Sequence, residues 1–359
     1  MLTWTRLLLS LLACLGGAAA APVPARPPVL VHVMPWFEAP PRSPAWGWHW
    51  TMGKADPTKG EVAAHARPLI GPYDSADPAV IAYQVALMKA AGIDGAIIDW
   101  NGQGGFPDYA MIHRNTGLLI AELRRAGLRF AICAEDNPGN RFLRESGRTR
   151  AEATARVAAS FAWLDQHWLR DEAYLRIGGR PVLLLFGPQY LEATEWQEIR
   201  RALTTDPLVL ALPHLRARLG ADGGFAWIPV SGGKDVEPAA ATAALAHLYG
   251  GLRADRAFAA VAYPGYRDYY AEAGAGRSFG RIEAQGGDTF ARSLDQALAS
   301  GAALVQVATW NDYGEGTVIE PTVADGHRHL RTLRRRLAPQ GADDVFPGLT
   351  EDFLKNRSR

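Results

Sequence analysis

Residues 77–100 read DPAVIAYQVALMKAAGIDGAIIDW and contain one complete helix–strand unit. Asp77 and Pro78 are the acceptor cap and the first-turn proline with which helices commonly begin, and Gly92 is the residue type with which they commonly end. Residues 95–100 are a short, mostly apolar run, which is typical of a strand covered on both faces. The stretch therefore predicts a helix followed by a strand of a parallel sheet.

The same alternation continues through most of the chain, which predicts repeated parallel βα units. The predicted strands cover residues 29–34, 95–100, 129–134, 181–186, 208–212, 225–228, 258–263 and 303–309. The predicted helices cover residues 78–91, 109–126, 150–168, 194–203, 238–249 and 289–299. Eight such repeats fit an α/β fold of the (β/α)8 type, a TIM barrel with enlarged βα loops. A doubly wound open sheet is the alternative, but its first strand would usually lead into a glycine-rich phosphate loop, and here Pro35 and Trp36 follow.

The composition fits one large domain. The chain has 359 residues, of which 48% are hydrophobic and 21% charged, and this is enough apolar material for a large core. Its 38 basic residues nearly balance its 37 acidic residues, so no overall field favours nucleic acid or anionic lipid. Two cysteines are too few for a disulfide framework or a cysteine-rich zinc site. We predict a barrel domain over residues 29–337 and a C-terminal appendage over residues 338–359.

The N-terminus has the pattern of an export signal. Arg6 precedes an apolar run, and small residues with an Ala-x-Ala ending at Ala20 follow it. This pattern predicts a secretory signal peptide over residues 1–20, and residues 21–28 then form a proline-rich linker. A lipoprotein signal with Cys14 as the lipidated residue is the alternative. We therefore expect a secreted or periplasmic protein, or an outer-membrane lipoprotein whose membrane contact is a lipid on Cys14.

Aromatic residues gather where the predicted strands end. Seven of the eleven tryptophans lie at or just after strand ends: Trp36, Trp46, Trp48, Trp50, Trp100, Trp227 and Trp310. The loops that follow barrel strands form the active site in this fold, and an indole plane can lie against the C–H face of a sugar. We therefore expect a carbohydrate site whose further contacts include His49, Tyr263, Asn311 and Tyr313. The alternative is that the tryptophans only fill a wide barrel mouth.

Paired carboxyl groups occur in the same places. Asp312 and Glu315 follow the last predicted strand three residues apart, while Asp99 and Glu135 end two neighbouring inner strands. Glycoside hydrolysis requires one protonated acid for the leaving oxygen and one carboxylate that acts as base or nucleophile. We expect Glu315 to keep its proton near neutral pH because Trp310, Tyr313 and the charge of Asp312 would raise its pKa.

The segment TWNDYGEGTVIEP, residues 309–321, resembles the strand-eight signature of glycoside hydrolase family 99, the endo-α-mannosidases and endo-α-mannanases. Its core also resembles the signature of family 71, the α-1,3-glucanases, and the resemblance extends over roughly residues 29–336. It implies Glu315 as general acid, Asp312 as general base and Glu135 as a contact to substrate hydroxyls. Family 99 has Glu where this chain has Asp312 and is thought to use it on the sugar's own 2-hydroxyl. Family 71 has Asp and inverts, so the resemblance leaves the stereochemical outcome and the sugar open.

The remaining patterns favour structural roles. His327 and His329 have no second ligand cluster nearby in the sequence, so no metal site is expected. The basic run RHLRTLRRR, residues 328–336, predicts an amphipathic helix that closes the barrel. Cys133 lies in an apolar run, which predicts a buried and inert thiol.

Together these observations predict an exported, monomeric endo-α-glycosidase that needs no cofactor and whose partner is an α-mannan-like or α-1,3-glucan-like carbohydrate. The main alternative is a surface glycan-binding protein on the same barrel that has lost turnover because Asp312 is too short. A polysaccharide-assembly glycosyltransferase is a third interpretation, but an exported protein would not meet cytoplasmic nucleotide sugars.

Overall fold

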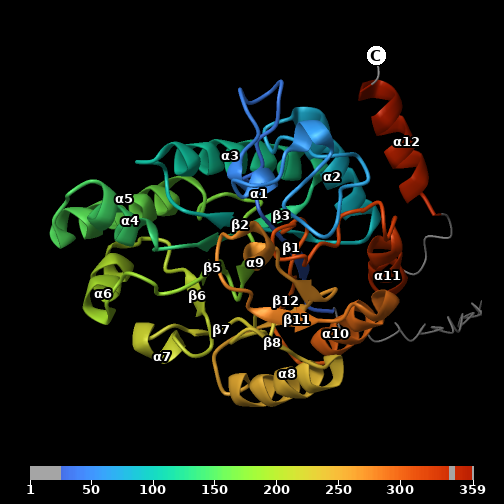
Figure 1. The fold of residues 1–359 in the computed structure, drawn as a ribbon. Helices are drawn as coiled ribbons and strands as arrows, with labels where there is room; N and C mark the ends of the chain where they lie inside the picture. Colours follow the sequence, from blue (N-terminus) through green and yellow to red (C-terminus); the bar gives the residue numbers. More distant parts are fainter. Residues whose placement is uncertain (1–25, 339–343, 358–359) are drawn as a thin grey trace, which may run out of the picture.

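The computed structural model describes residues 26–338 and 344–357. Within this part of the chain, eight parallel strands form the barrel seen in Figure 1, with helices around it. The strands are β1 (Val29–Val33), β2 (Gly95–Trp100), β3 (Arg129–Ala134), β5 (Arg180–Leu185), β6 (Leu208–Ala211), β7 (Gly223–Gly224), β9 (Ala259–Ala262) and β12 (Leu304–Val307). They pair in the order β7-β6-β5-β3-β2-β1-β12-β9, and a bridge between Phe225 and Ala259 joins the two ends. The predicted (β/α)8 barrel is confirmed.

The helices that follow the strands form the outer layer. They are α2 (Pro78–Ala90), α3 (Pro107–Ala126), α5 (Arg150–His167), α6 (Ala193–Ala202), α7 (Arg216–Leu219), α8 (Pro238–Leu252), α10 (Asp288–Leu298) and α11 (Arg328–Leu337). The caps read from the sequence are present: Asp77 accepts a hydrogen bond from the Ala79 amide at 2.9 Å, and Gly127 ends α3 at a φ of 73°. A left-handed φ of this kind suits glycine because the Cβ atom of any other residue would be sterically strained there.

Two strand predictions differ from the structure. The sixth strand of the barrel, β7, covers Gly223–Gly224 and ends just before the predicted range of residues 225–228. Phe225 and Ala226 continue the pairing outside the strand, because their amides donate to the carbonyls of Ala211 and Ala259. The eighth strand ends at Val307 instead of residue 309. The Thr309 amide turns away to bond the Thr317 carbonyl within the following loop at 2.7 Å.

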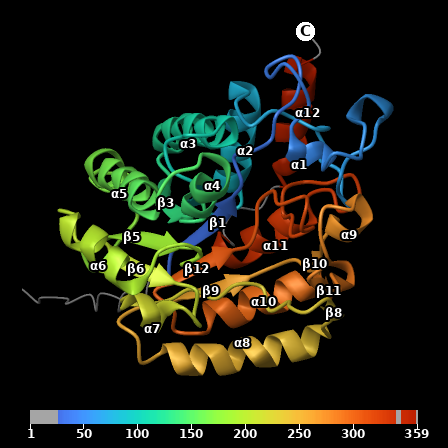
Figure 2. The same cartoon turned by 60° about the vertical axis from the view of Figure 1, so that its left-hand side comes forward.

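The enlarged βα loops carry their own secondary structure. They contain the short helices α1 (Trp48–Thr51), α4 (Pro138–Glu145) and α9 (Tyr270–Ala273), and two 3-10 turns over Pro57–Lys59 and Gln285–Gly287. Three short strands, β10 (Tyr266–Arg267), β11 (Gly280–Ile282) and β8 (Lys234–Asp235), form a separate sheet, and β4 (Arg176–Ile177) pairs with β5. Figures 1 and 2 show α1 and α9 on the same side of the molecule, where His65 pairs with Glu272 at 3.1 Å.

The segment predicted as a C-terminal appendage contains a helix that packs on the outer layer. Residues 346–357 form α12 (Phe346–Arg357), which lies beside α11 and α2 in Figure 1. Phe346 is fully buried, and Thr350 meets the Tyr83 hydroxyl at 2.9 Å and the His327 ring at 2.8 Å. This helix therefore packs with one face against the outer helices of the barrel.

The predicted signal peptide over residues 1–20 and Cys14 lie outside the described residues, as does the linker up to residue 25. In the described part of the chain, every helix is too short or too polar to cross a bilayer.

Candidate active site

The two carboxyl groups after β12 are held in one tight loop. The Asp312 amide donates to the Thr309 hydroxyl at 2.7 Å, and the Glu315 amide donates to Asp312 Oδ1 at 3.1 Å. The backbone of Arg267 and Tyr269 fixes the far side of this loop by donating to the Glu315 and Gly314 carbonyls at 3.0 and 2.9 Å. The loop thus places both acids at the carboxyl ends of the strands, where TIM barrels carry their chemistry.

Glu315 is set up to keep a proton. Its side chain is half-buried, and the Tyr270 hydroxyl donates to its Oε1 at 3.4 Å. Desolvation raises the pKa of Glu315 well above its usual range, and the negative charges of Asp312 and Asp268 raise it further. A carboxyl group that stays protonated near neutral pH can act as a general acid.

Asp312 is set up to lose its proton before Glu315 does. It is 5% exposed, and burial raises its pKa to about 6. The amides of Glu315 and Gly314 act in the opposite direction because they stabilise the carboxylate. The pair therefore combines an acid and a potential base in neighbouring positions of one loop.

Two more carboxyl groups lie below this pair. Asn101 donates to Glu135 Oε2 at 3.3 Å, and burial together with the charge of Asp136 raises the pKa of Glu135 to about 7. Asp99 is 3% exposed. Its pKa is well above the usual range because of burial and the charges of Glu135 and Asp312. The acidic floor expected from the sequence is therefore present as one electrostatically linked group.

The aromatic residues that reach the surface come mainly from the loop after β1. Trp36 and His49 stack with ring centroids 4.1 Å apart and planes 9° apart, and Trp48 is 50% exposed. Desolvation lowers the pKa of His49 to about 3, so this imidazole is neutral. Trp227 is partly exposed after β7 and meets the His32 ring edge to face at 5.1 Å. These four residues remain candidate sugar contacts.

Five predicted contacts are buried in the loop core and at the end of β9, which corrects their assignment. Trp50 is fully buried and donates to the Tyr73 carbonyl at 2.7 Å. Tyr313 is also fully buried, with its hydroxyl on Glu320 at 2.9 Å. Asn311 bonds both backbone groups of Met34 at 2.8 and 3.0 Å. The same correction applies to Trp310 and Tyr263, which are at most 1% exposed.

Trp100 is corrected for a different reason. Successive residues of a strand face opposite sides of the sheet, so Trp100 alternates with Asp99 and Asn101. It packs in the helix layer against Trp168, with ring centroids 5.5 Å apart, and donates to His113 at 3.2 Å. It is 1% exposed and faces away from the barrel interior.

Sequence reasoning missed two groups of residues that support the site. Tyr266, Asp268 and Tyr270 surround Glu315 from the loop after β9. Glu320 lies behind the loop that carries Asp312 and Glu315, where Tyr73 and Tyr313 donate to its Oε2 at 2.9 Å each. The aromatic run 266–270 and the acidic residue of the motif VIEP were the signals in the sequence that could have indicated them.

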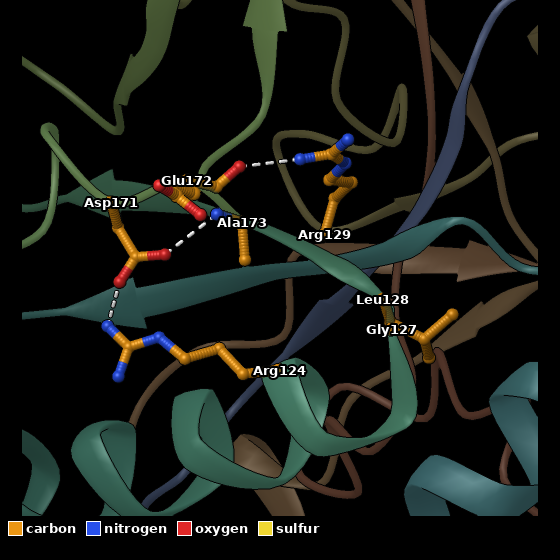
Figure 3. Close-up of a pocket in the computed structure, with 7 residues that line it drawn as sticks. All are labelled: Arg124, Gly127, Leu128, Arg129, Asp171, Glu172 and Ala173. Atoms are coloured by element: carbon orange, nitrogen blue, oxygen red, sulfur yellow. Dashed lines mark hydrogen bonds and ion pairs between the residues drawn. The ribbon is translucent and has the colours of Figure 1, made fainter.

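Two cavities in the described structure lie away from the carboxyl pair. One has a volume of about 610 Å³ and lies at the amino-terminal ends of the strands. Figure 3 shows its lining, where Arg124 pairs with Asp171 and Arg129 donates to the Glu172 carbonyl at 2.6 Å. The other, of about 620 Å³, is mostly apolar and lies between Trp227 and α8. Active sites of TIM barrels lie at the opposite face from the first cavity, so the carboxyl groups define the candidate site.

Comparison with solved structures shows the same fold in glycoside hydrolases. The chain is 18% identical to a GH99 endo-alpha-mannosidase from Bacteroides thetaiotaomicron, with a TM-score of 0.65 over 92% of this chain and 98% of that one. A structure of a GH99 endo-alpha-mannosidase from the same organism with bis-tris-propane gives 20% identity and a TM-score of 0.64 over 92% and 98%. A glycoside hydrolase-like protein gives 14% identity and a TM-score of 0.62 over 88% and 97%. The resemblance read from residues 309–321 is thus confirmed at the level of the fold.

Comparison with protein-family models gives no match, and comparison with curated proteins gives none either.

Proposed function

We propose that the chain is an exported glycoside hydrolase that cleaves α-linked oligosaccharides or polysaccharides. The observation that carries this proposal is the pair in the loop after β12, in which Glu315 holds a proton and Asp312 has a pKa of about 6. The fold shared with family 99 structures supports it. Export rests on the signal pattern of residues 1–20, and the mass of the exported chain's N-terminus tests that part.

In the proposed reaction, Glu315 gives its proton to the glycosidic oxygen as the bond to the anomeric carbon breaks. Asp312 takes a proton from the attacking hydroxyl, either a water or the substrate's own 2-hydroxyl. The neighbouring Glu135 and Asn101 offer hydrogen bonds to ring hydroxyls from the floor, and the Trp36–His49 stack and Trp48 offer apolar planes. All the functional groups that this mechanism needs are supplied by the protein.

The choice between water and the 2-hydroxyl decides the anomeric outcome. Attack by water in a single displacement inverts the configuration, whereas attack by the 2-hydroxyl followed by hydrolysis retains it. Asp312 is one methylene shorter than the family 99 glutamate, and this favours a bridging water between the carboxylate and the sugar. We therefore propose the inverting route, as the family 71 resemblance implies.

An NMR time course on a panel of α-mannose- and α-1,3-glucose-linked oligosaccharides tests the function. The wild-type chain should release a product of inverted configuration, and Glu315→Gln should lower kcat by roughly 10³-fold or more because the proton donor is removed. Oligosaccharide affinity should change little, because the amide keeps the shape of the side chain. Glu283→Gln, an exposed glutamate on the rim, should keep wild-type turnover.

Binding of the panel without product release by the wild-type chain would favour the glycan-binding alternative. Equal turnover by Glu315→Gln on a natural glycoside would remove the acid assignment, whatever the substrate proves to be.

A further inference from the structure

Three metal-ligating side chains meet inside the barrel below the candidate active site. His32 on β1, Asp99 on β2 and Cys133 on β3 each offer a donor atom, and these atoms all lie within 4.8 Å of one another. The three strands are neighbours in the sheet, and the side chains come from inward positions of their strands. The residues are 1%, 3% and 0% exposed, so the group is buried.

Asp99 has a buried oxygen that the protein does not satisfy. Its Oδ2 has no hydrogen-bond partner among the described residues. A buried carboxyl oxygen without a partner costs free energy, and a coordinated cation is one of the ways in which proteins satisfy such a group. This observation is independent of the donor spacing, and it points into the same cluster.

His32 is held in the tautomer that a metal ligand needs. Gln306 donates its amide to the Ala226 carbonyl, which fixes its Oε1 as an acceptor toward His32 Nδ1 at 3.4 Å. His32 must then carry its hydrogen on Nδ1, and the lone pair is left on Nε2. Metal-bound histidines are typically oriented by this kind of outer hydrogen bond.

We propose that His32, Asp99 and Cys133 bind one zinc-class divalent cation at the floor of the barrel. This site shares Asp99 with the acidic floor described above, but zinc binding can be measured whether or not the chain cleaves a glycoside. A nitrogen, an oxygen and a sulfur donor together suit zinc better than magnesium or calcium, which prefer oxygen alone. Zinc with bonds of about 2.0–2.3 Å in tetrahedral geometry holds its donors roughly 3.3–3.8 Å apart. Since the donor atoms lie within 4.8 Å of one another, they need to draw together by at most about 1–1.5 Å.

Metal binding at this site changes no oxidation state and needs no redox partner. The thiol of Cys133 loses its proton to solvent and becomes a thiolate, Asp99 binds as a carboxylate, and His32 binds as the neutral imidazole. The two positive charges of the cation thus balance the negative charges of the Cys133 thiolate and the Asp99 carboxylate. Three protein ligands leave a fourth position that a water can fill.

Metal content of the full-length protein tests the proposal directly. The chain is expressed with zinc chloride in the medium, purified without chelator and measured by native and inductively coupled plasma mass spectrometry. About one zinc ion per chain is expected to survive dialysis, because the site is buried. Cobalt chloride substituted for zinc should give the near-ultraviolet charge-transfer band of a cobalt–thiolate bond, since Cys133 is the one cysteine in the described residues.

Variants then assign the ligands. Cys133→Ser and Asp99→Asn should each lose the ion, and Gln306→Met should weaken zinc affinity about ten-fold because the histidine loses its outer partner. His167→Gln, at an exposed histidine on α5, should bind as the wild type does. The cobalt spectrum is recorded on the wild-type chain, so this part of the test does not depend on whether a variant folds. A wild-type chain that holds no zinc after dialysis, or a cobalt complex without the thiolate band, would overturn the proposal.

Discussion

At the residue scale, the assignment of acid and base depends on what surrounds Glu315. Asp312, Asp268, Tyr266 and Tyr270 all face it. The two carboxylates disfavour a further negative charge, and the buried setting adds to this effect. The same surroundings give Asp312 the lower pKa of the pair, because two backbone amides stabilise its charged form.

This arrangement predicts a bell-shaped pH dependence of kcat/KM. Activity should rise as pH passes about 6, where Asp312 loses its proton, and fall at higher pH where Glu315 loses its own. Asp268→Asn removes one of the negative charges that raise the pKa of Glu315, so the basic limb should move down by roughly one pH unit. The acidic limb should stay in place. A basic limb that does not move in Asp268→Asn would show that Glu315 is not the group that titrates there.

The aromatic contacts show which residue roles a sequence can predict. The positions of Asp312, Glu315, Asp99 and Glu135 followed from strand ends and from the motif, and the structure brings them together. The exposure of the aromatic side chains could not be predicted, because an aromatic residue at a strand end can face either the barrel interior or the helix layer. Trp100 faces the helices because it alternates with Asp99. Trp50 turns into the loop core because the Tyr73 carbonyl accepts its indole N–H.

Trp48 keeps the exposure that a sugar platform requires. It is 50% exposed and meets the His49 ring edge to face at 5.0 Å. Loss of an indole stacked on a sugar should weaken ground-state binding by about 1 kcal/mol, so Trp48→Ala should raise KM roughly five-fold on an oligosaccharide and leave kcat within about two-fold. Leu118→Ala, at an exposed apolar position on α3, is the control. An unchanged KM in Trp48→Ala would place the sugar elsewhere.

At the element scale, most boundaries could be predicted because caps and apolar runs mark them. The helix that begins after Asp77 and the strand over Gly95–Trp100 are both present within a residue of the prediction. The small sheet of β8, β10 and β11 could not be predicted, because its strands are short and polar and are defined by pairing between distant loops. Strand pairing of this kind has no local signal in the sequence.

The last helix shows the same limit. Residues 346–357 have a weak pattern, and their burial depends on the surface that α2 and α11 offer them. Phe346 is fully buried there, so Phe346→Ala should lower the free energy of unfolding by about 3–5 kcal/mol through lost packing and an uncollapsed cavity. Asp352→Ala, at an exposed position of the same helix, should cost less than about 0.5 kcal/mol. Denaturant unfolding measures both, and equal midpoints would mean that α12 does not stabilise the barrel.

At the scale of the whole molecule, the two ends of the barrel differ in how they shift the pKa values of their carboxyl groups. The amino-terminal face carries ion pairs, and at Asp222 they depress the pKa of the carboxyl group. Asp222 there meets Arg180 at 2.9 Å and Arg200 at 2.8 Å, and although burial opposes the shift, these guanidinium groups and the Val209 amide lower its pKa. The carboxyl-terminal face instead gathers acids whose pKa values are raised. The first arrangement stabilises the fold at neutral pH, and the second costs stability there.

This difference predicts how stability should depend on pH. The native state binds more protons at Asp312 and Glu315 than the unfolded chain does, so these groups destabilise the fold as pH rises from about 4, their unfolded pKa. For Asp312 the loss is complete above about pH 6, and it amounts to a few kcal/mol at most. Asp312→Asn and Glu315→Gln should therefore raise the Tm relative to wild type at pH 8, and the gain should shrink as pH falls toward 4.

Asp222 should affect the pH dependence of stability in the opposite direction, and this makes the test specific. Its depressed pKa stabilises the fold above about pH 4, and that contribution is lost as pH falls through the folded pKa. Asp222→Asn should thus lower the Tm at pH 8, whereas the two active-site variants raise it, and Glu283→Gln should follow the wild type throughout. Parallel Tm curves for all variants between pH 4 and 8 would mean that the raised pKa values of Asp312 and Glu315 do not exist in the folded protein. The acid and base roles would then lose their electrostatic basis, because the same interactions that cost stability are the ones that hold the proton on Glu315.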